Sequence, residues 1–272
     1  MIKLSSIKKD SPQTKTIFVD LNSDLGEGFG IYQNSKEEEI LPYVTSVNIP
    51  CAAHAGDPIK INKAVKLAKQ HKLSIGAHIG YPDIAGFGYR EMNLSFEELQ
   101  SLVLFQVGAL KTIAESYKVQ IEYVRPHGAM YKQVATDPAM AVSLASAIEI
   151  VDNWLILVCA PGTALNAVKE ETKIRTAPEI IINKQYDAQG NILFDEPQIT
   201  DIQTCVNVAS KLIKESKLIT KDGAIIDVDV KTIHLSTSLP NSINMASEIR
   251  NIFSERPLPV AISLVGDCAL NL

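Results

Sequence analysis

Seven short apolar or β-branched runs recur along this chain, and they limit its possible folds more than any other feature. They occupy residues 16–22, 44–50, 73–79, 121–127, 154–160, 179–183 and 232–238. Most of the runs are continuously apolar, as strands buried on both faces of a parallel sheet are. The runs alternate with stretches that carry helix signals, so the sequence predicts a parallel α/β architecture.

The helical stretches have recognisable starts. Asp57 followed by Pro58 opens a helix to residue 72, and Ser95 with Glu98 forms a capping box for a helix to about residue 117. Further helices are expected from residue 137, from residue 161, and over residues 199–217 and 241–254, with a small hairpin at 186–194. No repeat or low-complexity linker divides the chain. We therefore expect one domain over residues 1–272, in which residues 1–15 form a flexible or peripheral extension.

Composition bounds the function. The 272 residues are 46% hydrophobic, enough for a sizeable core, and the net charge of -5 argues against nucleic acid or an anionic membrane as the partner. The four cysteines are scattered without a CxxC pair, which is typical of reduced thiols. The first residues lack an apolar signal region, and no run is long enough to span a bilayer. The expectation is a cytoplasmic protein with a small-molecule ligand.

Polar residues follow several of the predicted strands at their C-terminal ends. They are Asp20 to Glu27 after the first run, His54 and Asp57 after the second, His78 and Asp83 after the third, and His127 after the fourth. In a barrel these ends converge on one mouth, whereas an open sheet spreads them along an edge. The sequence therefore predicts an irregular seven-stranded (β/α) barrel.

The stretch VDLNSDLGEGFG carries Asp20, Asn22, Asp24 and Glu27. An EF-hand loop beginning at Asp20 would need Gly and Glu where Leu25 and Ile31 stand, and the glycine spacing is not that of a phosphate loop. Convergent carboxylates and imidazoles can activate water, protonate a leaving group or hold a divalent cation. Neither an HExxH nor a CxxC motif is present. The sequence therefore allows a divalent metal at this site but does not identify its ligands. Nucleophilic Ser/His/Asp catalysis has weaker support, because no GxSxG is present.

Each of these residues also has a structural interpretation. Asp57 before Pro58 can simply cap a helix, and a lone histidine such as His78 is more often an interior residue than a ligand. We assign structural roles to His71 and His234, because neither lies in a loop rich in glycine and proline. Three histidines and at least four acids at successive strand ends are better explained by one shared site.

Six stretches, in one collinear order over most of the chain, resemble the LamB/YcsF family, which includes the A subunit of the ATP-dependent bacterial 5-oxoprolinase. They are DLNSDLGEGFG, NIPCAAHAGDP, IGAHIGYPD with GFGYR, Gln106 with GAL, RPHGAMY, and a block from Glu179 to Tyr186. The resemblance implies a barrel of the polysaccharide-deacetylase type (glycoside hydrolase/deacetylase superfamily). It also implies a cytosolic enzyme that opens the lactam of 5-oxoproline to L-glutamate with ATP and two partner subunits.

On this interpretation, Asp20, Asp24 or Glu27 is the base on water, and His54 and His127 shuttle the proton or polarise the carbonyl. Arg125 takes the substrate carboxylate, because its fork matches a carboxylate. The other expected substrate-binding residues are Asn22, Asp57, His78, Asp83, Arg90, Gln106, Tyr131 and Glu179. A homo-oligomer is also compatible with this assignment.

The chain departs from the family pattern at several positions. Ser236, Thr237 and Ser238 stand where the family has His-Gly-Asp, and Asn183 with Lys184 replaces an Asp-Arg pair. Arg125 replaces a lysine, Tyr89 replaces an arginine, and NIACGFHAGD has become NIPCAAHAGD. The serines in place of His-Gly-Asp motivate one rival hypothesis, a paralogue that binds a small molecule or regulates without catalysis. The Asp and His loops motivate a second, a metal-dependent deacetylase acting on an acylated sugar or amine.

Overall fold

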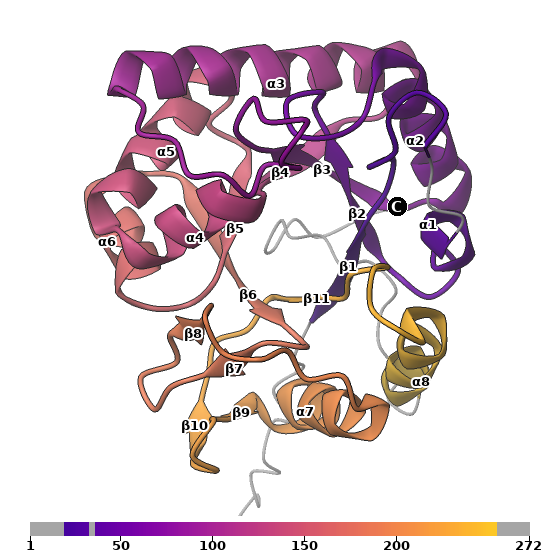
Figure 1. The fold of residues 1–272 in the computed structure, drawn as a ribbon, viewed down its shortest axis with the longest axis vertical. Coiled ribbons are helices and arrows are strands. Elements are labelled where there is room, and N and C mark those ends of the chain that lie inside the picture. The colour runs from indigo at the N-terminus through magenta and orange to yellow at the C-terminus, as the bar shows by residue number, and fades with distance from the viewer. Residues whose placement is uncertain (1–18, 33–35, 255–272) are drawn as a thin grey trace, which may run out of the picture.

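The computed structural model describes residues 19–32 and 36–254, and within them seven parallel strands close into a barrel (Figure 1). The order around the barrel is β1-β11-β6-β5-β4-β3-β2, and β1 closes on β11 with Asp20 opposite Thr232. The strands are β1 (Asp20–Asp24), β2 (Ser46–Pro50), β3 (Ser74–Ile79), β4 (Ile121–Pro126), β5 (Ile156–Cys159), β6 (Arg175–Ile181) and β11 (Thr232–His234). The predicted irregular seven-stranded barrel is confirmed.

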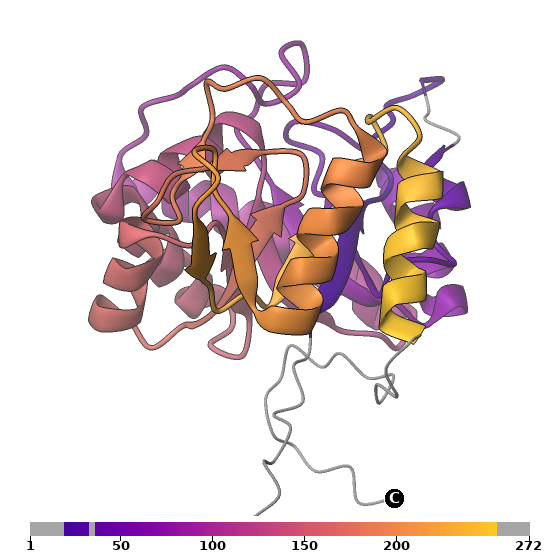
Figure 2. The ribbon, with the colours of Figure 1, turned by 90° about the horizontal axis from the view of Figure 1, so that it is seen from below.

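Helices surround the barrel, and two short hairpins lie beside β6 and α7 (Figures 1 and 2). The helices are α1 (Lys36–Glu39), α2 (Pro58–His71), α3 (Phe96–Ser116), α4 (Gly128–Thr136), α5 (Pro138–Val151), α6 (Thr163–Glu171), α7 (Ile202–Glu215) and α8 (Ser242–Ser254). The hairpins pair β7 (Gln185–Tyr186) with β8 (Ile192–Leu193), and β9 (Lys217–Ile219) with β10 (Ile225–Asp227). Within the described residues no single helix is long and apolar enough to cross a membrane; α4 and α5 reach that length and composition only as a pair bent by 115°.

The predicted helix starts are confirmed at three caps. Asp57 accepts hydrogen bonds from the backbone N–H groups of Ile59 and Lys60, and Ser95 forms its capping box with Glu98. Asp137 accepts from the first backbone N–H groups of α5. Each cap satisfies amide groups that a helix N-terminus leaves without partners.

Some elements differ from the sequence prediction. β6 begins at Arg175 rather than at residue 179. The sequence did not indicate this earlier start, because Arg175 and Thr176 are only half-buried and do not belong to an apolar run. The last strand ends at His234. Helices α1 and α4 and the β9–β10 hairpin were not predicted, because such short elements carry little periodicity. The expected extension at residues 1–15 lies outside the described residues, and the single-domain assignment stays a prediction.

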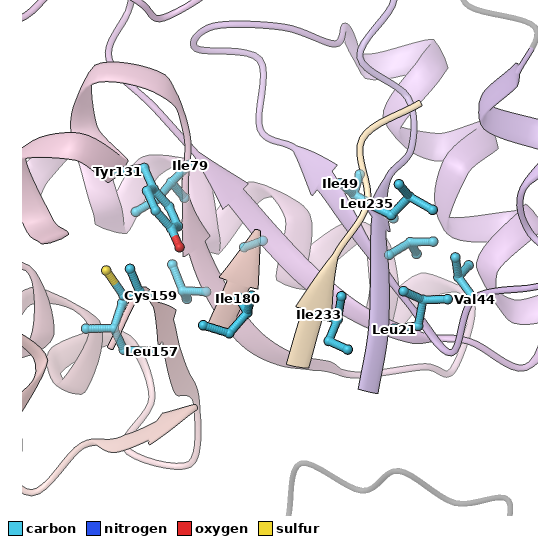
Figure 3. Packing of buried hydrophobic residues seen from close by; sticks show 14 of the residues in the cluster. Leu21, Val44, Ile49, Ile79, Tyr131, Leu157, Cys159, Ile180, Ile233 and Leu235 are labelled. Carbon is cyan, nitrogen blue, oxygen red and sulfur yellow. The ribbon is translucent and has the colours of Figure 1, made fainter. Parts of the chain in front are cut away.

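The barrel strands alternate between two buried environments. Outward-facing side chains such as Leu21, Ile180 and Ile233 belong to the main hydrophobic core (Figure 3). Tyr123 belongs to a second, small apolar cluster inside the barrel, completed by Ile156, Val158 and Ala177. Gly76 on the neighbouring strand makes room for that tyrosine, because a Cβ there would lie 2.0 Å from its ring. The strands are therefore buried on both faces: the outer face is apolar, and the inner face combines this small apolar cluster with buried polar side chains.

Candidate active site

The lowest polar layer inside the barrel is centred on Asp20. Its carboxylate accepts hydrogen bonds from the hydroxyl groups of Thr45, Ser46 (2.7 Å) and Thr232 (2.6 Å). Burial raises the pKa of Asp20, although these hydroxyl groups act in the opposite direction. Because three hydroxyl groups already occupy its oxygens, the geometry favours a structural role for this residue over that of a base on water.

Asn22 joins the strands one layer higher. Its amide nitrogen donates to Glu179 (3.0 Å) and Thr232 (2.6 Å), and its oxygen accepts from Asn48 (2.8 Å). Nδ1 of His234 lies 2.8 Å from the same oxygen. The Asn22 amide is therefore saturated by protein groups, as a buried carboxamide must be.

Arg125 and Glu179 form a buried ion pair across the interior. The Arg125 Nε lies 2.9 and 3.0 Å from the two carboxylate oxygens, and Nη2 lies 2.9 Å from Oε2. The guanidinium also lies 5.0 Å above the centre of the Tyr131 ring. Burial opposes the charge on Glu179, but Arg125, His234 and the Asn22 hydrogen bond together outweigh it and lower the carboxyl pKa. The two-nitrogen edge that would take a substrate carboxylate is thus already occupied by Glu179.

Asp24 lies above this pair, at the C-terminal end of β1. Its Oδ1 accepts a hydrogen bond from Asn48 (2.9 Å) and lies 3.9 Å from Nη1 of Arg125, while Oδ2 lies 3.5 Å from Nε2 of His234. Burial by itself would raise the pKa of Asp24, but the positive potential of His234 and Arg125 and the Asn48 bond lower it. Among the described residues, Asn48 makes the one hydrogen bond to this carboxylate, which leaves acceptor capacity at the mouth.

Three histidines and Glu27 gather beside Asp24. His78 comes from β3, His127 directly follows β4, and His54 lies in the loop between β2 and α2. His54 stacks on His127 with 3.9 Å between ring centres and 4° between planes. His78 Nε2 lies 3.5 Å from Asp24 and 3.9 Å from Glu27. The structure thus brings together Asp24, Glu27 and all three histidines that the sequence placed at the barrel mouth.

The ionisation of this cluster follows from its burial. Burial lowers the pKa of His54 and His78 well below the usual value and that of His127 to about 4. Burial also raises the pKa of Glu27 well above its usual range, with the nearby Asp24 carboxylate adding to the effect. The free site therefore has neutral imidazoles next to one ionised acid, Asp24.

The remaining predicted site residues hold the surrounding loops. Asp57 caps α2 and accepts from Gly30 N–H (3.0 Å), and the buried Gln106 bonds both backbone groups of Gly80 at 3.0 Å. Asp83 binds the Gly86 N–H (2.9 Å) and the exposed Arg90 guanidinium. None of these contacts places a side chain of Asp57, Asp83, Arg90 or Gln106 next to Asp24. Tyr131 keeps a buried hydroxyl without a partner among the described residues.

Several positions that depart from the family pattern lie after β6 and β11. Ser236 and Ser238 bond each other at 2.8 Å through their hydroxyl groups. Asn183 donates to Gln198 (3.1 Å), and Lys184 reaches the Phe194 carbonyl (3.4 Å). These side chains contact residues 2 to 15 positions away in the sequence.

Sequence reasoning missed three residues of the site. His234, assigned a structural role, contacts Asn22 and Asp24, and its position at the end of a strand could have identified it. Asn48 bonds both Asn22 and Asp24; its alternation with Ser46 along β2 was the available signal. Glu37 lies buried on α1, where its Oε2 accepts from Gly26 N–H (2.7 Å) and burial raises its pKa to about 7. No sequence signal marked Glu37.

Comparison with known proteins identifies this arrangement, since residues 19–263 match the LamB/YcsF family. The chain belongs to the LamB/YcsF family. It is 36% identical over 245 residues to the 5-oxoprolinase A subunit of Staphylococcus carnosus, covering 89% of this chain and 97% of that relative. The relative of the same name from Pyrococcus abyssi is also 36% identical, over 89% and 96% of the two chains. The resemblance inferred from the motifs is confirmed.

A solved structure from the family has the same fold. The lactam utilization protein from Thermus thermophilus superimposes with a TM-score of 0.82 at 34% identity, covering 88% of this chain and 97% of that one. The match extends over the barrel and its helices, so the LamB/YcsF assignment rests on both sequence and structure.

Proposed function

We propose that this chain is the A-type subunit of an ATP-dependent 5-oxoprolinase, opening the lactam of 5-oxoproline or a similar ring to L-glutamate in the cytoplasm. Its relatives named as 5-oxoprolinase A subunits cover most of the chain, and the structural neighbour is named a lactam utilization protein. Those names describe one component of a complex, and the proposal takes the partners to be the two other 5-oxoprolinase subunits.

The observation that carries the proposal is the state of Asp24. Asp20 accepts three hydroxyl hydrogen bonds and Glu179 is paired with Arg125, but Asp24 accepts one hydrogen bond and has a lowered pKa. An ionised carboxylate with a free lone pair, at the end of a barrel strand, is suited to take a proton from water. Asp24 is therefore the base we assign.

The reaction follows from this assignment. With ATP, the partner subunits would phosphorylate the lactam oxygen, which makes the ring carbon a better electrophile. Asp24 takes one proton from water as the oxygen attacks that carbon. The carbon–nitrogen bond then breaks as the ring nitrogen takes a proton, which leaves an acyl phosphate and a free amine. A second water attacks the acyl phosphate and releases phosphate and a proton, which gives the carboxylate of glutamate. Neutral His54, with two unpartnered ring nitrogens among the described residues, is placed to relay the first water's proton from Asp24 to the ring nitrogen.

Arg125 has a different role in this proposal from the one expected from sequence. Its fork holds Glu179, and Nη1 faces Asp24 at 3.9 Å. The proposal therefore assigns Arg125 to keeping Asp24 ionised, while other groups bind the substrate carboxylate.

The test is ATP-dependent conversion of labelled 5-oxoproline to glutamate by this chain with the two other subunits, with the chain omitted as control. Asp24→Asn removes the base while keeping the shape, and it should lower kcat by at least about 100-fold. Asp137→Asn is the matched control: it makes the same chemical change at a helix cap, where Asn also caps well, and it should retain activity. Undiminished turnover by Asp24→Asn would remove this residue from the mechanism.

The two rival hypotheses predict other outcomes of the same experiment. The mutual hydrogen bond of Ser236 and Ser238, where the family has His and Asp, favours a non-catalytic binding paralogue. That hypothesis predicts stabilisation by 5-oxoproline in a thermal melt without any product. The deacetylase hypothesis predicts that the chain releases acetate from an acetylated sugar without ATP or partners.

A further inference from the structure

The histidine cluster at the barrel mouth has a geometry that proton transfer alone does not require. One potential ligand atom from each of Glu27, His54, His78 and His127 can be chosen so that all four lie within 4.8 Å of one another. A fourth histidine near the mouth, His234, bonds Asn22 instead. The cluster thus offers three imidazole nitrogens and one carboxylate oxygen to a common point.

The hydrogen bonds of two rings fix which nitrogen carries the proton. His78 Nδ1 lies 3.1 Å from the Arg125 carbonyl, and His127 Nε2 lies 2.8 Å from the Phe87 carbonyl. A carbonyl oxygen only accepts, so each of these nitrogens is the N–H donor of a neutral ring. The opposite nitrogens, His78 Nε2 and His127 Nδ1, therefore hold lone pairs.

These two lone pairs face each other. His78 Nε2 and His127 Nδ1 are 3.1 Å apart, and between neutral rings this contact is repulsive unless a proton or a cation lies between them. Nη1 of Arg125 lies 3.4 Å from His78 Nε2, which provides one weak donor for that nitrogen and none for His127 Nδ1. Imidazoles that donate one N–H to a backbone carbonyl and direct the other nitrogen to a common point are the usual arrangement of metal-binding histidines.

His54 supplies an independent observation. It is fully buried, yet neither ring nitrogen has a hydrogen-bond partner among the described residues. Buried polar atoms are nearly always paired, because an unpaired one loses its hydrogen bonds to water without replacement. Its ring stacks on His127, which keeps it at the cluster. A metal ion that accepts the imidazole lone pair would give one of these two nitrogens a partner.

We propose that Glu27, His54, His78 and His127 bind one divalent transition-metal ion of the zinc type. Three nitrogen donors and one carboxylate suit Zn²⁺, Co²⁺ or Ni²⁺, whereas Mg²⁺ and Ca²⁺ prefer an all-oxygen shell. The single carboxylate charge also partly neutralises the ion inside a buried site. An ion that takes the His54 lone pair would prevent that ring from relaying a proton, so the metal-bound form and the relay are alternative states of His54. The binding tests do not measure the lactam reaction, so their failure is distinguishable from failure of the proposed function.

The first test measures Zn²⁺ binding by the full chain after treatment with a chelator, by equilibrium dialysis and titration calorimetry. We expect one Zn²⁺ per chain at micromolar or lower concentration. His78→Gln and His127→Gln should each weaken binding by at least about 100-fold. His71→Gln is the matched control, since His71 lies exposed at the end of α2, and it should bind like the original chain.

A second measurement avoids variants that fail to fold. Co²⁺ added to the original chain should give the visible absorption of a four- or five-coordinate site, and Zn²⁺ should displace it. Glu27→Gln changes a half-buried side chain without a hydrogen bond in the described residues, so it should fold and yet bind more weakly. The proposal is overturned if the original chain binds no Zn²⁺ in this range. It is equally overturned if the three cluster variants and His71→Gln bind alike, because the ion would then lie elsewhere.

Discussion

At the scale of single residues, the barrel interior is built from pairs of charges and amides that satisfy one another. Arg125 and Glu179 share three nitrogen–oxygen contacts of 2.9–3.0 Å, and both side chains are nearly inaccessible to solvent. Each charge is tolerated in the interior because the other is present. The pair is therefore expected to respond asymmetrically to substitution.

Glu179→Gln keeps the size of the side chain but leaves the Arg125 charge buried without its partner. We expect this change to lower the free energy of unfolding by about 3–5 kcal/mol. Arg125→Lys, which keeps a positive charge but loses the two-nitrogen fork, should cost less. Urea denaturation followed by circular dichroism measures both. A loss below about 1 kcal/mol for Glu179→Gln would show that water reaches the guanidinium.

Glu37 makes stability depend on pH near neutrality. Its pKa is raised from about 4.5 to about 7, chiefly by burial, so the folded chain holds this proton more tightly than the unfolded chain does. The free energy of unfolding should therefore fall as the pH rises from about 4.5 to about 7 and should level off above that range. The loss from this group is at most about 3 kcal/mol. In Glu37→Gln this component is absent.

The measurement is urea denaturation of both proteins between about pH 4 and about pH 8, where the stability of Glu37→Gln relative to the original should increase with pH. A difference that stays constant over this range would mean that Glu37 ionises normally in the folded chain. A difference that decreases with pH would reverse the assigned direction of the pKa shift.

At the scale of elements, the loop over residues 83–90 positions the histidine cluster. Its Phe87 carbonyl accepts from His127, and its Gly88 carbonyl accepts from Ala129 N–H (2.9 Å) at the start of α4. Gly88 has φ +74°, and a Cβ there would lie 2.8 Å from atoms of both His54 and His127. The loop thus fits the stacked rings because this position has no side chain.

Gly88→Ala should lower the free energy of unfolding by at least about 1–2 kcal/mol from the backbone conformation alone. It should also disturb the two histidine rings, visible as shifts of their NMR signals. Gly108→Ala, in the middle of α3 with no atom within 4 Å of the added Cβ, is the control and should stabilise by up to about 1 kcal/mol. Equal stability of the two variants would contradict the close packing at Gly88.

At the scale of the whole molecule, the closure of the barrel depends on polar contacts between the first and last strands. Thr232 on β11 donates to Asp20, accepts from Asn22, and stands opposite Asp20 in the strand register. The few register pairs between β1 and β11 are therefore reinforced from inside the barrel.

Thr232→Val keeps the shape but removes the hydroxyl group that serves both neighbours. The loss should be about 1–3 kcal/mol, because two buried polar groups lose a partner. Thr112→Val, on the exposed face of α3, is the matched control and should stay within about 0.5 kcal/mol of the original chain. Thermal and urea unfolding of the pair measure the difference; similar values for both would show that the interior hydroxyl is replaced by water.

The barrel could be predicted because seven buried runs and polar strand ends are local signals, each readable within about ten residues. Asp24, Glu27 and the three histidines were predicted for the same reason. The saturation of Asp20 and the commitment of Arg125 to Glu179 depend on partners 25 to 212 positions away, so spacing along the chain could not reveal them. The place of His234 beside the site was not predicted, because its neighbours in the sequence are apolar or small and its contacts are with the distant Asn22 and Asp24.

The contacts between β1 and β11 also determine when a newly synthesised chain can complete its candidate active site. A ribosome would release the acids of β1 early, but Thr232 and His234 emerge more than 200 residues later. Until then Asp20 lacks one of its three side-chain partners, Thr232, and Asn22 lacks two, Thr232 and His234. Premature termination before β11 would yield no partial activity, and a ligand that needs Asp24 in place would recognise only finished molecules.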